Sequence, residues 1–362
     1  MSSLLHKVEN SDRKIWDNCA SVYEERIVSG HPNVTAYEAF EEDFLDALLI
    51  HLGRDCGRTM QLYDFGCGSG RLHLRYALKS IDLQDHPRGV QRAVQAARAN
   101  RPDYAYCPVF NKRLIHISGV DFSARMISLA REKLASSGLS KLEPCFFSFD
   151  LGSALNVPPY RGKATPVAVS VCNSIGVMQG PAGARMLFDS MRKYVQKRRG
   201  IAVISAYRKD ALLSFGLGNY ESTLNVSGQP SWLTPKTYAS GVNTLLPRSY
   251  KTAFDPSANI LVDVYDARHR LVAAGVNLKR NPKDVAATLS SGRITTGTGY
   301  TSNWYSVRQF KEWIRDCWPR GSSYHIEGRR LDVLRGRPAQ LAILDGTGAL
   351  KGFFSRWGIP CS

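Results

Sequence analysis

The segment 62–71, LYDFGCGSGR, decides the fold of this chain. Leu62–Phe65 has the apolar character of a buried strand, and Gly66, Gly68 and Gly70 follow it directly, ahead of a stretch with helical character. Glycine has no Cβ, so the backbone can turn sharply there and approach a ligand closely. A strand, a glycine-rich turn and a helix in this order are typical of a nucleotide-type ligand site at the first crossover of a doubly wound α/β sheet.

The glycine spacing narrows the class of ligand. It is GxGxG, one residue shorter than the GxGxxG fingerprint of dinucleotide-binding sites. Asp64 ends the strand just before the glycines, where a carboxylate can face a ligand. The segment therefore predicts a nucleotide-type site of a different kind from that of the dehydrogenases.

The elements that follow alternate between strands and helices, which predicts a largely parallel α/β sheet with right-handed crossovers. Polar residues at 82–113, with a helix expected at 90–99, interrupt this rhythm. Apolar runs and helical periodicity predict strands at 58–65, 114–120, 145–149, 167–172 and 201–206, and helices at 71–79, 124–136, 182–196 and 306–316. The remaining expectations are helices within 12–52, short strands at 260–265 and 271–276, and last strands at 324–327 and 340–344.

Polar side chains end the successive strands: Asp64, Asp121, Asp150 and Asn173. Ligands of open α/β sheets bind outside the carboxyl ends of the strands, so these side chains are expected around one ligand. A carboxylate at Asp121 is suited to two ribose hydroxyls, because it has only acceptors. Asp150, with Leu151, is suited to an adenine ring and its amino group. The alternative for each residue is a turn or helix N-cap, which Asp and Asn favour anyway.

Over residues 60–206 these motifs resemble the class I S-adenosylmethionine-dependent methyltransferase family. Asp64–Gly70 is similar to the first motif of that family, and Asp121 and Asp150 stand at its later acidic positions. Cys172–Gly176 looks like the fourth-strand motif of members that act on small molecules, and 16–23 resembles a helix that closes over the cofactor. Members of the family that methylate DNA adenine or amide nitrogens carry the sequence Asn-Pro-Pro-Tyr after the fourth strand. This chain has no such sequence there.

The resemblance implies a cofactor, a reaction and a set of site residues. The cofactor is S-adenosyl-L-methionine, the product is S-adenosyl-L-homocysteine, and the methyl group passes by SN2 displacement to an N, O or C atom of a small acceptor. Asn173 is expected near the methionine end of the cofactor. The implied cofactor-binding residues are Trp16, Tyr23, Asp64, Gly66, Cys67, Gly68, Gly70, Asp121, Phe122, Met126, Asp150, Leu151 and Asn173.

The general base is not identified by the sequence. Position alone makes candidates of His31, Tyr207, Tyr300, Trp304 and Tyr305. The alternative for these aromatic residues is that they pack a lid onto the sheet.

The fold implied by the resemblance is a Rossmann-like, seven-stranded α/β sheet with helices on both faces. We expect an N-terminal helical lid at 1–57, a cofactor-binding core at 58–206 that contains the 82–113 insertion, a large α+β insertion after the fifth strand at 207–305 that forms a lid over the substrate, and completion of the core sheet by 306–362.

The charge composition of the chain indicates which classes of partner it favours. The 362 residues carry 48 Lys and Arg against 31 Asp and Glu, a net charge of +17. Such a balance favours an anionic small substrate or nucleic acid. The leading hypothesis is a small-molecule methyltransferase in specialised metabolism. The alternatives are an RNA or mRNA-cap methyltransferase that uses the basic surface, and a non-catalytic protein that binds the cofactor.

Other features give weaker expectations. The start of the chain has no apolar leader and the eight cysteines have no paired spacing, so a cytoplasmic location is expected. No apolar run is long enough for a membrane helix, and no residue cluster has metal-ligand spacing, so neither a membrane nor a required metal is expected. The oligomeric state stays open, with a dimer as one expectation.

Overall fold

The computed structural model describes residues 13–18, 20, 32–142, 146–209, 251–252, 263–265, 271–274, 293–295, 301–317, 322–327, 339–350 and 352–353. Within these ranges, no helix combines the length and the apolar character that crossing a bilayer requires. Tyr23, His31 and Tyr300 lie outside the described residues, as does most of the expected 207–305 insertion.

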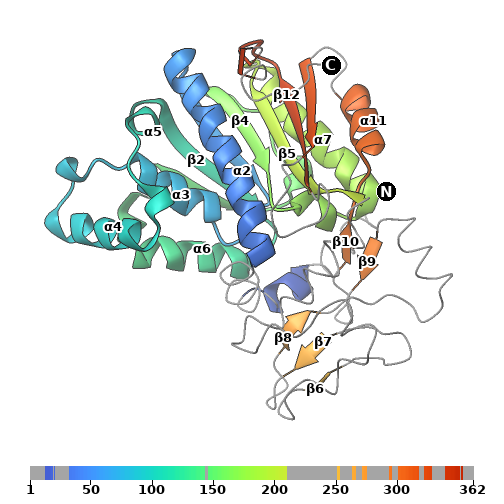
Figure 1. The fold of residues 1–362 in the computed structure, drawn as a ribbon, viewed down its shortest axis with the longest axis horizontal. Coiled ribbons are helices and arrows are strands. Elements are labelled where there is room, and N and C mark those ends of the chain that lie inside the picture. The colour runs from blue at the N-terminus through green and yellow to red at the C-terminus, as the bar shows by residue number, and fades with distance from the viewer. Residues whose placement is uncertain are drawn as a thin grey trace.

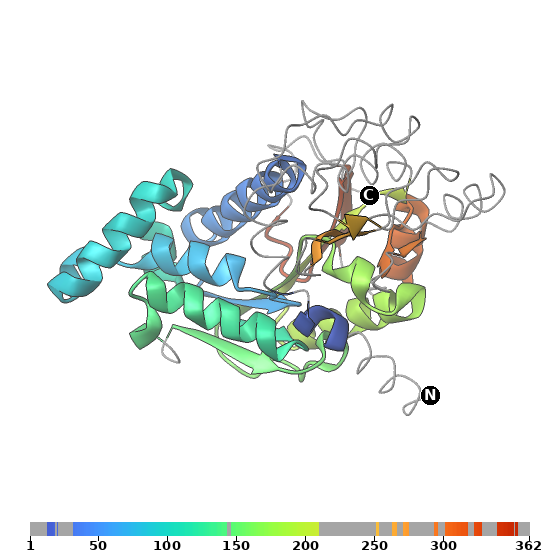
Figure 2. The same cartoon turned by 90° about the horizontal axis from the view of Figure 1, so that it is seen from below.

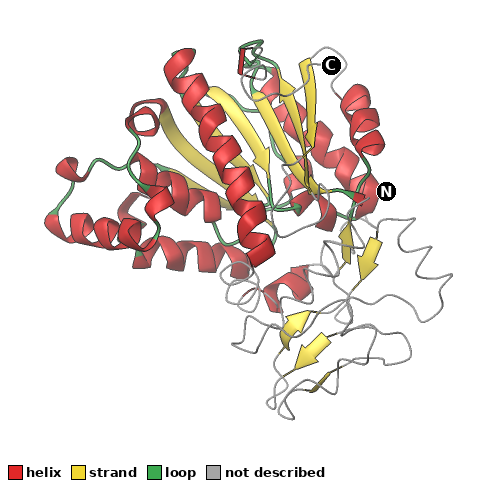
Figure 3. Ribbon diagram, viewed as in Figure 1, coloured by secondary structure: helices red, strands yellow, loops and turns green. Residues whose placement is uncertain are grey.

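The described chain forms one large mixed sheet flanked by helices (Figures 1 and 3). Its helices are α2 (Pro32–Ile50), α3 (Arg71–Ser80), α4 (Arg88–Asn100), α5 (Pro108–Arg113), α6 (Ala124–Ser136), α7 (Gly180–Gln196) and α11 (Val307–Cys317). The strands of the large sheet are β1 (Met60–Phe65), β2 (Leu114–Asp121), β3 (Phe147–Leu151), β4 (Thr165–Ser170), β5 (Ile201–Tyr207), β11 (Ser322–Glu327) and β12 (Ala339–Asp345). Two small sheets comprise β6 (Lys251–Thr252), β7 (Asp263–Tyr265) and β8 (Leu271–Ala274), and β9 (Arg293–Thr295) and β10 (Thr301–Asn303).

The strand order of the large sheet is β11-β12-β5-β4-β1-β2-β3. Strands β1 to β5 are mutually parallel, whereas β12 runs antiparallel to both β5 and β11. The chain moves outward from β1 to β3 in one direction and then returns to place β4 on the other side of β1. The order therefore reverses between β1 and β4, which is where open α/β sheets bind ligands.

Helices cover both faces of the sheet, as the view from below shows (Figure 2), and a hydrophobic core lies on each face. Successive side chains of a strand point to opposite faces. In β5, Ile201 and Val203 therefore join the core under α2, α3 and α6, whereas Ala202 and Ile204 join the core under α7 and α11. Because both faces of the sheet are buried, its central strands are apolar along nearly their whole length.

Helix α2 is fixed to α3 by ion pairs as well as by apolar packing. Glu42 and Asp46 of α2 face Arg75 of α3 at 2.6 Å each, and Asp46 also meets Lys79 at 3.0 Å. The Arg75 side chain is only 2% exposed. Because a buried charge is tolerated only when it is paired, the two helices carry complementary charges on facing turns. Helix α2 is thus part of the rigid core rather than a loosely attached cover.

The segment 82–113 packs against the end of α3. Asp103 pairs with Arg75 at 2.8 Å, and its carbonyl accepts a hydrogen bond from Lys79 at 2.7 Å. Arg98 of α4 donates to the carbonyls of Leu78 and Ile81. This segment therefore covers the C-terminal end of α3 and neutralises part of its charge.

The expected α/β class, with a mixed sheet and helices, is confirmed. The helix at 124–136 has the predicted bounds, and the other core strands and helices agree within a few residues. The strand expected at 167–172 ends earlier, at Ser170, because Cys172 and Asn173 adopt left-handed backbone angles that break the extended chain.

The buried Arg75 network gives a test of the core. Arg75→Met keeps most of the side-chain volume but removes the buried cation that Glu42 and Asp46 share, which leaves Glu42 with Arg71 alone and Asp46 with Lys79 alone. We expect the free energy of unfolding, measured by urea denaturation, to fall by about 3–5 kcal/mol. The control is Arg92→Met on the exposed face of α4, with an expected change within about 0.5 kcal/mol. Equal effects of the two substitutions would contradict the role of the network.

Candidate functional site

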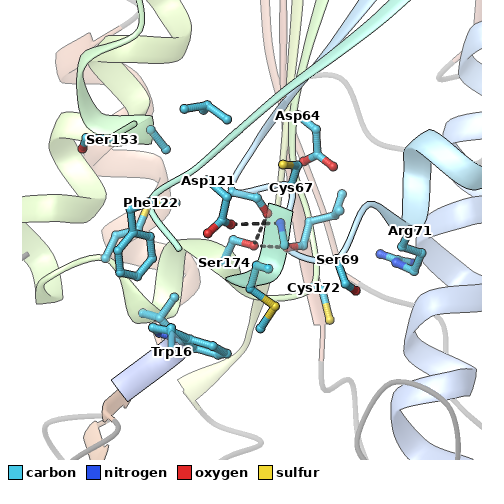
Figure 4. Close-up of a pocket in the computed structure, with 18 of the residues that line it drawn as sticks. Trp16, Asp64, Cys67, Ser69, Arg71, Asp121, Phe122, Ser153, Cys172 and Ser174 are labelled. Carbon is cyan, nitrogen blue, oxygen red and sulfur yellow. Dashed lines mark hydrogen bonds between the residues drawn. The ribbon is translucent and has the colours of Figure 1, made fainter. Parts of the chain in front are cut away.

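A cavity of about 1040 Å³, its open mouth included, lies at the carboxyl ends of β1, β2 and β4 (Figure 4). Its walls come from the glycine turn after β1, the end of β2, the loop after β3 and the turn after β4. It occupies the point where the strand order reverses.

The glycine turn forms one wall. Gly66, Gly68 and Gly70 all have positive φ, at 89°, 51° and 73°. A Cβ on Gly68 would meet no atom within 4 Å, so the backbone itself lines the cavity there. A Cβ on Gly70 would lie 2.8 Å from the Cβ of Ala130, so this glycine lets the start of α3 pack against α6. Gly68 thus leaves the backbone of the turn open to the cavity, whereas Gly70 allows α3 to pack closely against α6.

Asp121 links the end of β2 to this turn. Its Oδ2 accepts a hydrogen bond from Gly68 N at 2.9 Å, and its Oδ1 accepts one from Ser123 N at 2.9 Å. Burial raises the pKa of Asp121 to about 6, although these backbone donors oppose the shift. Each carboxylate oxygen keeps further acceptor capacity. The bonds therefore fix the orientation of Asp121 without exhausting its acceptors.

Asp64 is the most deeply buried carboxylate of the cavity lining. It is 2% exposed, and its Oδ1 has no hydrogen-bond partner among the described residues. Burial raises its pKa to about 7; Arg71 opposes this shift, whereas Asp121 and Glu41 add to it. A buried acceptor without a partner is costly. A bound group that donates hydrogen bonds or carries positive charge would remove that cost.

The helical segment 13–18 closes one side of the cavity with Trp16 (Figure 4). Asp17 holds it in place, because its Oδ1 accepts hydrogen bonds from Ser123 Oγ at 2.6 Å and Arg125 N at 3.2 Å. Ser123 is also the N-cap of α6 and directly follows Phe122, another lining residue. The N-terminal segment is therefore attached at the residues that follow Asp121.

The turn after β4 forms the opposite wall and has a strained backbone. Cys172, Asn173 and Gln179 have φ of 53°, 56° and 51°, which costs on the order of 1 kcal/mol or more for each non-glycine residue. The hydrogen bonds that hold this turn include those from Cys172 N to Glu41 Oε1 at 2.7 Å and from Tyr207 N to Asn173 Oδ1 at 3.1 Å. Such strain, held by its surroundings, is often found at binding sites.

Glu41 joins this wall to the glycine turn. Its side chain is fully buried, and its other oxygen pairs with Arg71 at 2.7 Å. Arg71 also pairs with Glu42 at 2.9 Å and lines the cavity. Among the described residues, the cavity lining thus contains one guanidinium, from Arg71, beside the carboxylates of Asp64 and Asp121.

Eight of the thirteen residues expected at a cofactor line the cavity. These are Trp16, Asp64, Gly66, Cys67, Gly68, Asp121, Phe122 and Met126. Their individual roles at a bound cofactor stay predictions.

Four expected cofactor residues lie outside the lining. Gly70 packs on α6, and Asn173 turns its amide oxygen to β5. Asp150 accepts a hydrogen bond from Tyr63 Oη at 3.1 Å, and Leu151 is 59% exposed. After β3, the cavity lining comes from the next residues along, Ser153–Leu155, and the expected roles of Asp150 and Leu151 at an adenine stay predictions.

The described candidates for a general base lie in the hydrophobic cores. Tyr207 and Trp304 pack with ring centroids 4.7 Å apart, and Tyr305 lies against Trp313 at 4.8 Å. All three candidates are buried and absent from the cavity lining. Their aromatic rings pack the 301–305 segment against the sheet, and a role for any of them as a general base stays a prediction.

Several lining residues were missed by the sequence analysis. They are Ser69, Arg71, Leu72, Val120, Ser153, Ala154, Leu155, Val171, Cys172, Ser174, Val177, Met178 and Gln179. Cys172 and Ser174 belong to the motif noted after the fourth strand, which was the available signal for them. Within the described residues, no group of three His, Cys, Asp or Glu side chains is placed to hold a metal ion.

Comparisons with known proteins give similar structures at low identity. A scan of family models and a search of the curated proteins both found no match. The CcbJ methyltransferase from Streptomyces caelestis is 14% identical, with a TM-score of 0.43 over 92% of this chain and 98% of that one. The magnesium protoporphyrin IX methyltransferase ChlM from Synechocystis, solved with S-adenosylhomocysteine, is 10% identical, with a TM-score of 0.43 over 93% and 98%. The small RNA methyltransferase HEN1 is 15% identical, with a TM-score of 0.40 over 86% of this chain and 26% of that one.

Asp64 makes stability depend on pH. The unfolded chain loses this proton near the ordinary pKa of 3.8, whereas the folded chain keeps it to about 7. The folded state therefore binds more protons between these values, and the stabilisation present below pH 4 is lost as the pH rises through 7.

The test compares wild type with Asp64→Asn. The Tm difference in favour of the variant should grow from pH 4 to pH 8, reaching the equivalent of a few kcal/mol. Asp85→Asn, on the surface, is the control for loss of a carboxylate. A Tm difference that does not change with pH would contradict the raised pKa of Asp64.

Proposed function

We propose that this chain is an S-adenosylmethionine-dependent methyltransferase that transfers a methyl group to a small molecule. The observation that carries the proposal is the buried, unpartnered carboxylate oxygen of Asp64 beside the glycine turn. A pyrophosphate at this position would face the carboxylates of Asp64 and Asp121. A ligand with an ammonium and a sulfonium group instead finds complementary charge.

The cavity residues fit the parts of such a cofactor. Asp64 would accept from the amino group of the methionine moiety, and Arg71 would face its carboxylate. Asp121 would accept from the ribose hydroxyls, while Phe122 and Met126 would contact the adenine. When bound, the cofactor supplies an electrophilic methyl group. The work of the chain is then to hold the acceptor in line with it and to exclude water.

The turn after β4 supports a small acceptor. Val171, Val177 and Met178 give this wall an apolar surface, to which Ser174 and Gln179 add polar groups. Apolar walls with a few polar groups are typical of small-molecule sites. The helical segment with Trp16 would close the cofactor side, and the 207–305 segment would cover the acceptor side as a lid. The sheet would then be of the class I methyltransferase type.

An RNA acceptor is the second candidate, and the net charge of +17 favours it. A small-molecule enzyme needs no such charge, whereas RNA phosphates attract it. Incubation with S-adenosylmethionine and either metabolite extracts or RNA, with S-adenosylhomocysteine release as readout, separates the two acceptors. A non-catalytic protein would bind the cofactor and release no product with either.

Cofactor binding is tested first, by isothermal titration. Wild type should bind S-adenosylmethionine and not NADH. Asp121→Ala should weaken binding by about 10- to 100-fold, because it removes bonds to a charged acceptor. Asp85→Ala should leave the affinity unchanged. Binding of NADH instead would overturn the proposed cofactor, and an unaffected Asp121→Ala variant would overturn the ribose assignment alone.

A further inference from the structure

The edge of the sheet opposite the cavity carries a row of cations. The parallel strands β2, β1, β4 and β5 all begin at this edge, and basic residues precede each of them. The residues of this row, called here the basic edge, are Lys112 and Arg113 before β2, Arg58 before β1, Arg161 and Lys163 before β4, and Lys197, Arg198 and Arg199 before β5. Four adjacent strands span about 15 Å, which sets the width of the row.

Hydrogen bonds connect neighbouring parts of the basic edge. Arg113 donates to the carbonyl of Gly57 at 3.2 Å, next to Arg58, and Arg58 lies 3.5 Å from Thr165 Oγ1 at the start of β4. Tyr160 N donates to Tyr194 O at 3.1 Å, which brings the loop with Arg161 and Lys163 against the last turn of α7. The row is therefore continuous in space as well as in strand order.

The charges of the basic edge are unbalanced. None of its eight cations forms an ion pair with a carboxylate of the described chain; Asp55, close by, pairs with His51 and Arg54. Six of the eight are exposed, and Arg58 and Arg113 are partly so. Cations at the ends of α5 and α7 complement the helix dipoles. That effect does not account for Arg161 and Lys163, which lie in a loop.

We propose that the basic edge binds the phosphate backbone of nucleic acid. A rigid row of cations matches a polymer with a charge on every residue, and arginine, the commoner cation here, pairs well with phosphate. Membrane-binding surfaces add several apolar side chains, whereas Ile115 is the exposed large apolar residue that adjoins this row. Binding is through phosphates and independent of base sequence.

The proposal is separate from the proposed methyltransferase activity. The cavity lies at the carboxyl ends of the same strands, so a nucleic acid on the basic edge leaves the cavity open. Cofactor titration and nucleic-acid binding can therefore fail independently of each other.

The test is fluorescence anisotropy of a labelled, mixed-sequence, single-stranded RNA of about 20 nucleotides, at salt concentrations from about 50 to 200 mM. Wild type should bind, with affinity falling steeply as salt rises. A quadruple variant, Arg161→Gln, Lys163→Gln, Lys197→Gln and Arg198→Gln, should bind at least about tenfold more weakly, and its log–log salt slope should be shallower by about three. Its affinity for S-adenosylmethionine should equal that of wild type, which also shows that it folds.

The matched control removes four exposed cations from α4 and α11, with Arg88→Gln, Arg92→Gln, Lys311→Gln and Arg315→Gln. This control should keep most of the RNA affinity and slope. Absence of RNA binding by wild type, or equal losses in the two quadruple variants, would overturn the proposal. So would binding to anionic phospholipid vesicles or polyglutamate without binding to RNA.

Discussion

The structure depends on the buried ion pairs between α2 and α3. Arg71 and Arg75 are one helical turn apart and face Glu41, Glu42 and Asp46, whose spacing matches along α2. Apolar packing alone would let the helices slide, whereas each of these charges is acceptable in the interior only opposite its partner. The register of α2 is thereby fixed, and with it the position of Glu41 under the cavity. Glu41 then holds both Arg71 and the backbone of Cys172, so one carboxylate spaces the two walls of the site.

The ion pairs between α2 and α3 also affect the electrostatics of the cavity. Arg71 is paired with two glutamates, and its charge opposes only part of the effect of burial on Asp64. Burial raises the pKa of both aspartates, to about 7 and about 6, because the surrounding protein excludes water from their charge. A cationic ligand would reverse this effect and favour the ionised forms. The burial of these two carboxylates therefore favours a positively charged ligand.

The sequence predicts those parts of the fold that local patterns determine. The helix at 124–136 has its predicted bounds because Ser123 caps it and apolar residues recur at helical spacing. Eight of the thirteen expected cofactor residues line the cavity because parallel strands end at one edge. Asp150 and Asn173 do not, since their side chains are taken up by Tyr63 and the backbone of Tyr207. Glu41 and Arg71 could not be found this way: they are 30 residues apart, and no local pattern signals their pairing.

Strand direction also separates charges at the two edges of the sheet. Crossover helices place their N-termini, with partial positive charge, at the carboxyl edge of parallel strands and their C-termini at the amino edge. Acidic residues at the first edge and basic residues at the second are each stabilised by these dipoles. The cavity accordingly holds Asp64 and Asp121, while the basic edge holds Lys112 at the end of α5 and Arg198 just after α7. A cationic small ligand and an anionic polymer would thus be drawn to opposite ends of the same strands, so neither would compete with the other for the site.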